Sequence, residues 1–248
     1  MAQQKSFELI NPAGRSSLVL TCEHASYDVP EEYQGLGISR EEIRRHIGWD
    51  IGARAVVQAL AQVLDAPAIC SRYSRLLIDC NRDLADHDLI VPESDGTQVP
   101  FNHDLSVEER HNRIERFYQP YHEAIDNLFN TRDSENLTLL SIHSFTPVLG
   151  KSERQFDLGI LFDRYEDLAQ EVGQRLAYSG SAVRYNEPYS GYEGLIFSAR
   201  THGQQHGIVY LEIEINNSLI TDEERAKRMG QVLGTVLQEM FLKKSDKQ

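Results

Sequence analysis

Apolar residues fall in short runs that end in polar side chains, and these runs alternate with longer stretches where apolar positions recur every three to four residues. Runs of four to eight residues favour strands, and the longer periodicity favours amphipathic helices. We predict strands at 17–22, 66–70, 75–80, 137–142, 156–162, 182–185 and 207–215. We predict helices at 41–64, 106–129, 165–178 and 221–241. This alternation predicts an α/β fold with one wide, mainly parallel sheet covered by helices.

Polar signals mark the ends of these elements. Ser106 and Thr221 each stand three positions before an acidic residue, as in a capping box at a helix start. Two segments, 89–104 and 187–207, are rich in Pro, Gly, Ser and Asn and are predicted to be long loops, which often line binding sites. No repeat or linker interrupts the pattern, so we expect a single catalytic domain over residues 1–248.

The composition narrows the class of partner. Lys and Arg number 25 against 38 Asp and Glu, giving a net charge of -13 that disfavours nucleic acid and anionic membranes and favours a small substrate. An acidic substrate would then need a local cationic pocket. Three cysteines, the lack of an apolar leader and the lack of an apolar stretch of about 18 residues indicate a reduced, cytoplasmic protein. The oligomeric state is not predictable from these features.

Two histidines follow predicted strands directly. His24 comes after the run LVLTC, and His143 comes after LTLLSI. A lone histidine in this position more often caps a strand through a hydrogen bond. Two of them at the ends of neighbouring parallel strands would converge, and imidazole is a common zinc ligand. We therefore predict a Zn²⁺ site.

A catalytic zinc ion commonly takes a carboxylate as its third protein ligand. Asp50, in HIGWDIGA, is our preferred candidate, and Glu23, beside His24, is the alternative. Asp50 could instead serve as a helix-start carboxylate, and Glu23 could orient a ligand from behind. His46 is a weaker substitute.

The motif IDCNRD offers a place for a carboxylate. Arg82 carries a planar guanidinium that can bind a carboxylate through two hydrogen bonds, and Asn81 adds an amide donor. The alternative is that Arg82 forms a structural ion pair with Asp79 or Asp83. Arg75, just upstream, could polarise a carbonyl or be exposed.

The motif YLEIEINN places Glu212 and Glu214 on the same face of a strand because side chains alternate. Buried carboxylates are costly unless they have a use, and one of the two could act as general base beside a zinc-activated water. The alternative is an edge strand with solvated glutamates.

Seven other histidines form no ligand spacing and are predicted to be surface or loop residues: His46, His87, His103, His111, His122, His202 and His206.

The motifs TCEHAS, HIGWDIGA, SRYSRLLIDCNRD, SIHSFTP, FDLGILF, NEPYSGYEG and LEIEINNSLI, in this order, resemble the N-formylglutamate amidohydrolase family over roughly residues 18–222. That family is similar to zinc carboxypeptidases and aspartoacylases. The resemblance implies a three-layer α/β/α fold with zinc at the strand ends. No HxxE pair of the carboxypeptidase type follows His24, so the third ligand stays open.

By position, the resemblance implies that His24 and His143 bind the metal, that Asn81 and Arg82 bind the substrate carboxylate, and that Glu214 is the general base. We expect Asp50 to complete the metal site and Arg75 to stabilise the tetrahedral oxyanion. The expected reaction, in amino-acid metabolism, converts N-formyl-L-glutamate to formate and L-glutamate.

Two alternatives stay open. One is a related zinc deacylase or carboxypeptidase that acts on another N-acyl amino acid or a short peptide. The other is a metal-binding or carboxylate-binding protein without turnover.

Overall fold

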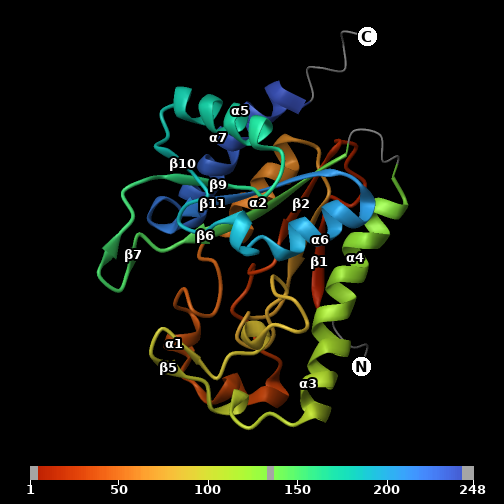
Figure 1. The fold of residues 1–248 in the computed structure, drawn as a ribbon, viewed down its shortest axis with the longest axis vertical. Coiled ribbons are helices and arrows are strands. Elements are labelled where there is room, and N and C mark those ends of the chain that lie inside the picture. Colours follow the sequence, from red (N-terminus) through yellow and green to blue (C-terminus); the bar gives the residue numbers. More distant parts are fainter. Residues whose placement is uncertain (1–4, 133–136, 242–248) are drawn as a thin grey trace.

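A computed structural model describes residues 5–132 and 137–241, and its centre is a mixed sheet of seven strands (Figure 1). The strand order is β1-β3-β2-β6-β11-β9-β10. The strands are β1 (Phe7–Ile10), β2 (Leu18–Cys22), β3 (Ala68–Ser71), β6 (Thr138–Phe145), β9 (Leu158–Leu161), β10 (Val183–Tyr185) and β11 (Val209–Asn216). Four neighbouring pairs are parallel, and β1/β3 and β9/β11 are antiparallel. The mainly parallel sheet is thus confirmed.

One face of the sheet is covered by three amphipathic helices, α2 (Ala53–Val63), α5 (Glu166–Tyr178) and α7 (Glu223–Phe241). Leu211, Ile213 and Ile215 of β11 point into the core on this side. Alternation along β11 therefore sends the intervening side chains, including Glu212 and Glu214, to the opposite face.

The opposite face is covered by α4 (Gln119–Asn130), α6 (Phe197–His206) and the segments between β3 and α4. In Figure 1, α4 and α6 lie side by side, away from α5 and α7. Tyr210, Tyr121 and Leu139 belong to this second core. The three-layer α/β/α arrangement is confirmed.

One predicted strand is wrong. Residues 75–80 form turns instead of a strand, and β1, which we did not predict, takes the edge position beside β3. Leu76, Leu77 and Ile78 are buried, so the apolar run is real, but its backbone forms a turn, in which the amide of Leu77 donates to the carbonyl of Ser74. Apolar runs identify burial more reliably than conformation.

The predicted helix 41–64 is two helices, α1 (Arg40–Ile43) and α2, separated by turns. Two glycines explain the break. Gly52 has φ of +82° at the start of α2, and a Cβ on Gly48 would lie 1.9 Å from the carbonyl oxygen of Ile43. The chain therefore turns sharply here and places Asp50 between the two glycines.

The predicted helix 106–129 is continuous but not regular. It consists of α3 (Val107–Arg113), a π-helical turn (Ile114–Tyr118) and α4. Ser106 caps it by accepting a hydrogen bond from the amide of Glu109 at 3.0 Å. The cap of α7 is Asp222, which accepts from the amide of Arg225, instead of Thr221.

The predicted loop 187–207 contains α6, which has a weakly amphipathic, polar sequence and so gives little helical signal. The predicted loop 89–104 contains the short hairpin β4 (Glu93–Ser94) and β5 (Thr97–Gln98). A second short hairpin is β7 (Val148–Leu149) and β8 (Ser152–Glu153). Single 3₁₀ turns occur at His87–Leu89, Pro100–Asn102, Gly191–Glu193 and Asn217–Leu219, and a kinked 3₁₀ segment occurs at Glu31–Gly37.

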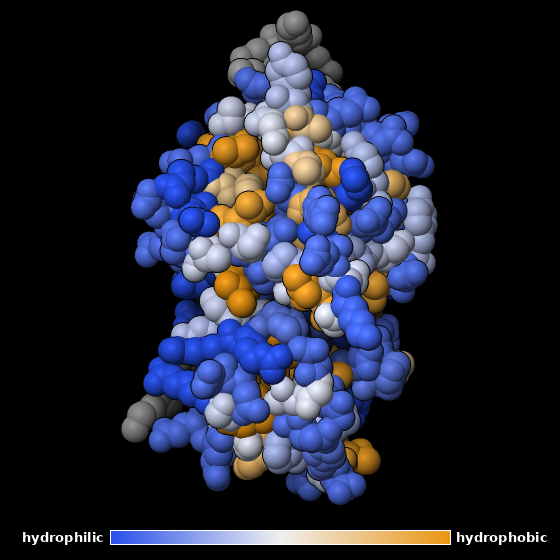
Figure 2. Space-filling model, turned by 90° about the vertical axis from the view of Figure 1, so that its left-hand side faces the viewer, coloured by the Kyte–Doolittle hydropathy of each residue, from blue (hydrophilic) through white to orange (hydrophobic). Residues whose placement is uncertain are grey.

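The surface agrees with the acidic, polar composition. Figure 2 shows mainly hydrophilic side chains on one face, with hydrophobic side chains scattered among them. Within residues 5–132 and 137–241, no helix has the length and apolar character needed to cross a membrane. Cys22, Cys70 and Cys80 are free and buried.

The close approach of α2 and α7 is tested at Gly230. A Cβ there would lie 2.6 Å from the Cβ of Ala59 and 2.9 Å from the carbonyl oxygen of Val56. We expect Gly230→Ala to lower the free energy of unfolding by about 1–3 kcal/mol through overpacking, despite the better helix propensity of Ala. Urea denaturation measures this, with the exposed Gln231→Ala as control. An unchanged Gly230→Ala stability would contradict the tight packing.

Candidate active site

Polar side chains of three neighbouring strands gather at one edge of the sheet. His24 follows β2, His143 lies in β6, and Glu214 of β11 is paired in register with His143. These three strands are parallel, so their carboxyl ends meet at the same edge, and sites in such sheets commonly form there. The predicted proximity of His24 and His143 is confirmed by ring centroids 4.8 Å apart.

Asp50 lies between the two histidines. Its Oδ2 is 2.8 Å from Nδ1 of His143 and 3.6 Å from Nδ1 of His24. The backbone amide of Asp50 donates to the carbonyl of His24, and the amide of Ser144 donates to Oδ2 at 3.1 Å. His24, Asp50 and His143 are 4%, 3% and 2% exposed, so the cluster is shielded from water.

The far ring nitrogens of both histidines contact buried carboxylates. Nε2 of His24 is 2.7 Å from Oδ1 of Asp79, and Nε2 of His143 is 2.9 Å from Oε2 of Glu23. Metal-binding histidines commonly donate their second N–H to a carboxylate, which selects the tautomer and orients the ring. Here that pattern leaves both Nδ1 atoms directed towards Asp50.

This donor set fits a zinc ion. Nδ1 of His24 is buried and has no hydrogen-bond partner among the described residues, which is costly for a polar atom unless something else binds it. Two imidazole nitrogens and one carboxylate oxygen, all within 4.8 Å of one another, match the commonest ligands of a catalytic zinc site.

Glu23 is fully engaged. Its Oε1 accepts from the hydroxyl of Tyr121 at 2.8 Å, and its Oε2 accepts from Ser141 at 2.6 Å and from His143. Burial opposes ionisation, but the bonds from His143, Ser141 and Tyr121 outweigh it and hold the pKa of Glu23 below its usual range.

Asp79 and Asp50 are also ionised despite burial. The charge and hydrogen bond of His24 hold the pKa of Asp79 below its usual range. The guanidinium of Arg75 and the charge of His24 hold the pKa of Asp50 well below its usual range, with the hydrogen bond from His143 adding to this effect. These carboxylates can therefore offset positive charge at the cluster.

Glu212 and Glu214 behave differently. Burial, opposed by the charge of His143, raises the pKa of Glu212 to about 7. Burial and the neighbouring carboxylates raise the pKa of Glu214 well above its usual value. One oxygen of each, Oε2, is buried and lacks a hydrogen-bond partner among the described residues, although Oε2 of Glu212 lies 3.6 Å from Nε2 of His143. Two carboxyl groups poised to hold or release a proton thus stand next to His143.

The IDCNRD segment lies beside this cluster, and Asn81 and Arg82 have different hydrogen-bond partners. The amide nitrogen of Asn81 donates to the carbonyl of Leu195 at 3.2 Å, and its oxygen accepts from the amide of Ser198 at 2.9 Å. Arg82 donates to the carbonyl of Asn81 and forms no ion pair within the described residues, so the alternative pairing with Asp79 or Asp83 is absent there. Arg75 forms an ion pair with Asp50 and is mostly buried.

Comparison with known proteins agrees with this geometry. The sequence model of the N-formylglutamate amidohydrolase family matches residues 16–221. The chain belongs to this family. Its membership assigns the protein to the hydrolases and confirms the resemblance stated above.

Solved structures extend the comparison. The gene product Atu2144 from Agrobacterium tumefaciens is 31% identical, with a TM-score of 0.89 and 96% of each chain covered. N-formylglutamate amidohydrolase from Ralstonia eutropha JMP134 is 21% identical, with a TM-score of 0.76, 97% of this chain and 99% of that chain covered. The cell shape determinant Csd4 from Helicobacter pylori shares the fold at 10% identity and a TM-score of 0.51, covering 95% of this chain and 55% of that one. No curated protein matches the chain.

Sequence reasoning missed several residues of this candidate site. Asp79 was considered only as a partner for Arg82, although its place in IDCNRD brings it to His24. Tyr121 and Ser141 hold Glu23, and Tyr189 of the motif NEPYSGYEG is close enough to Glu214 for that carboxylate to help burial raise its pKa. Their motifs were visible, but no spacing rule connects a helix residue with a strand end.

Two of the other histidines test predictions made from the sequence. His46 lies 3.5 Å from Asp95 and not in the His24 cluster, so it does not substitute for Asp50. The prediction that His202 is a surface or loop residue is wrong, because it is 2% exposed and lies in α6.

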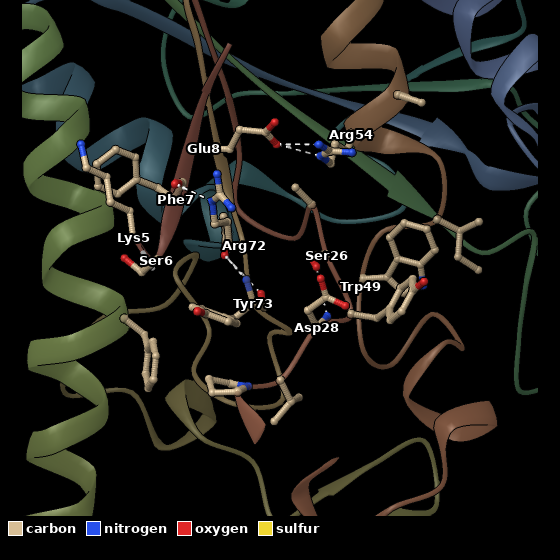
Figure 3. Close-up of a pocket in the computed structure, with 18 of the residues that line it drawn as sticks. Lys5, Ser6, Phe7, Glu8, Ser26, Asp28, Trp49, Arg54, Arg72 and Tyr73 are labelled. Carbon is tan, nitrogen blue, oxygen red and sulfur yellow. Dashed lines mark hydrogen bonds and ion pairs between the residues drawn. The ribbon is translucent and has the colours of Figure 1, made fainter. Parts of the chain in front are cut away.

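A large groove borders the cluster without including its ligand residues, and Ala25 and Ile51, the neighbours of His24 and Asp50, are in its wall. It has a volume of about 1390 Å³ and contains Ser26 and Trp49, yet neither the histidines nor Asp50 line it (Figure 3). Arg54 bonds twice to Glu8, at 2.7 and 2.9 Å, and Arg72 donates to the carbonyl of Phe7. These cations are committed to the fold, so we do not assign the reaction to this groove.

The support of Glu23 is tested by Tyr121→Phe. The substitution removes a donor to a buried carboxylate, and such hydrogen bonds contribute about 1.5–3 kcal/mol. We expect a loss of that size in the free energy of unfolding. Tyr178→Phe, the same change at a side chain that is 96% exposed, is the control and should be neutral. Equal stabilities for the two variants would show that Glu23 does not need Tyr121.

Proposed function

We propose that this protein hydrolyses the amide bond of a small N-acyl amino acid, N-formyl-L-glutamate above all, with a zinc ion held by His24, His143 and Asp50. The observation that carries this proposal is the arrangement of the two histidines: each directs Nδ1 towards Asp50 while Nε2 contacts a buried carboxylate. Family membership supports the reaction type. A cytoplasmic location stays a prediction.

Asp50 is a better third ligand than Glu23. The three hydrogen bonds to Glu23 use both of its oxygens, and one of them fixes the tautomer of His143. Asp50 has Oδ2 on the side of both Nδ1 atoms and Oδ1 paired with Arg75. In this assignment Glu23 and Asp79 are positioning residues for the histidines.

When bound, zinc would lower the pKa of a coordinated water and polarise the scissile carbonyl. Glu214 would accept the proton of the attacking water and deliver it to the leaving amine, so formate and the amino acid depart. Its buried, unpartnered Oε2 and raised pKa suit a group that holds a proton during the reaction. Arg75, beside Asp50, would stabilise the tetrahedral oxyanion with the donors that Asp50 does not use.

Arg82 and Asn81 would bind the substrate carboxylate. Arg82 forms no ion pair among the described residues, although its charge contributes to the lowered pKa of Asp79, and its guanidinium can form two charge-assisted hydrogen bonds to a ligand. Asn81 has one amide hydrogen beyond the bond to Leu195. Together they supply the local cationic pocket that an acidic substrate needs on a protein of net charge -13.

Glu214→Gln separates metal binding from catalysis. The variant should keep its zinc, because Glu214 is not one of the three ligands, but lose about 10²–10⁴-fold in kcat, the usual contribution of a general base. Formate release from N-formyl-L-glutamate and metal content per chain are the two measurements. Glu41→Gln, an exposed change of the same kind, should keep full activity.

His24→Ala completes this experiment and should lose the zinc of the active site together with activity. Zinc-independent formate release, or equal rates in Glu214→Gln and the wild type, would overturn the mechanism. Bound zinc without turnover on a panel of N-formyl and N-acetyl amino acids would favour a binding protein. Turnover only of N-acetyl substrates would favour a different deacylase.

Arg82→Gln tests the carboxylate pocket. Loss of two charge-assisted hydrogen bonds should lower kcat/KM for N-formyl-L-glutamate by about 10–150-fold, from the 1.5–3 kcal/mol typical of such bonds. N-formyl-L-glutamine, which lacks the side-chain carboxylate, distinguishes the two carboxylates of the substrate. Arg82→Gln should lower kcat/KM for this substrate by the same factor if Arg82 binds the α-carboxylate, and hardly at all if Arg82 binds the side-chain carboxylate. The exposed Arg184→Gln is the control, and similar kinetics for both variants would exclude Arg82 from the pocket.

A further inference from the structure

A second group of metal-ligating side chains lies between α4 and α6, outside the proposed active site. His202 and His206 are four residues apart on α6 and therefore share one face of that helix. Asp126 of α4 faces them: its Oδ1 is 2.8 Å from Nδ1 of His202 and 2.8 Å from Nε2 of His206. None of these residues takes part in the proposed reaction.

We propose that Asp126, His202 and His206 form a second divalent-cation site, of the class that binds Zn²⁺. The three donor atoms lie within 4.8 Å of one another, whereas tetrahedral zinc with bonds of about 2.0–2.1 Å holds its ligand atoms about 3.3 Å apart. Oδ1 of Asp126 lies 2.8 Å from each histidine nitrogen, so an outward shift of about half an ångström would bring these two distances to the tetrahedral value. Two histidines at i and i+4 with a carboxylate are a recurrent zinc donor set.

His122 supplies the supporting contact that such sites require. Its Nδ1 is 2.8 Å from Nε2 of His202, and the two rings are stacked with centroids 5.1 Å apart. An ion on Nδ1 of His202 forces the proton of that ring onto Nε2, where His122 Nδ1 accepts it. The tautomer needed for metal binding is thus the one that the neighbouring ring can satisfy.

Exposure rises from His202 through His206 to Asp126, so the site can be reached from the side of Asp126. The side chain of His202 is 2% exposed, that of His206 14% and that of Asp126 28%. The ring of Phe129 covers His206 on one side, at 5.1 Å between centroids. The ion can therefore arrive from solvent at Asp126 and keep a water as its fourth ligand.

The site would join two helices that support the active site. Tyr121 of α4 holds Glu23, and the first turn of α6 is bound by Asn81 through the amide of Ser198. A cation between the helices stabilises the folded form because the unfolded chain does not assemble the site. Its role is structural, and it does not depend on the proposed function.

Zinc counting in variants tests this site. Metal-free wild-type protein dialysed against Zn²⁺ should bind two equivalents, and His206→Ala should bind one. The His24→Ala protein should keep one equivalent, which the double variant His24→Ala/His206→Ala loses. His111→Ala, a histidine whose side chain is 66% exposed on α3, is the matched control and should bind as the wild type does.

His206→Gln keeps a donor to Asp126 and guards against a folding defect in His206→Ala. Added Zn²⁺ should raise the unfolding temperature of the His24→Ala protein, and this rise should disappear when His206→Gln is combined with it. Co²⁺ bound to His24→Ala should give the visible absorption of a tetrahedral site. Equal zinc content with and without His206, in the wild type and in the His24→Ala background, overturns the site whether or not the active site binds metal.

Discussion

The ionised carboxylate of Asp50 is the interaction on which the rest of the site depends. A buried charge of this kind is stable only if its surroundings replace the water that it has lost. Asp50 receives that replacement from Arg75, from the Nδ1 atom of His143 and from the amide of Ser144, with the charge of His24 nearby. Removing any of these groups would leave the carboxylate unmatched.

The same requirement extends outward to two further carboxylates. Glu23 and Asp79 fix the far sides of the two histidine rings and are themselves held by other donors, such as Tyr121 for Glu23 and the amide of Asn81 for Asp79. The ring of His143 therefore contacts Glu23 and Asp50 through its two nitrogens. The ring of His24 contacts Asp79 through Nε2 and directs Nδ1 towards Asp50. Rigid placement of this kind is what a metal site needs, because ligands that must reorganise bind more weakly.

The two faces of the sheet differ in what they contain. On one face, α2, α5 and α7 pack a continuous apolar core against Leu211, Ile213 and Ile215, which makes the strands rigid. The other face contains Glu212 and Glu214 of the same strand, together with Tyr121 and the polar network. Alternation in β11 thus sends apolar side chains into one core and the two poised carboxyl groups towards the candidate site.

The sequence by itself determined the features that depend on local pattern. Strand periodicity located six of the seven strands, and alternation in YLEIEINN identified the face that bears Glu212 and Glu214. It also placed His24 just after its strand, because the polar residue that ends an apolar run is visible in one dimension. His143, predicted to follow its strand, lies inside β6, which continues to Phe145. The fold class followed from the same alternation of runs and amphipathic stretches.

Only the tertiary structure decided the features that depend on distant partners. Residues 75–80 are as apolar as a strand, yet β1 occupies the edge, since pairing is a property of two segments and not of one. Asp79 and Tyr121 approach the cluster across 55 and 98 residues of chain, and no spacing rule reaches that far. The burial of His202 likewise arises from α4 packing on α6, which a polar helix sequence does not signal.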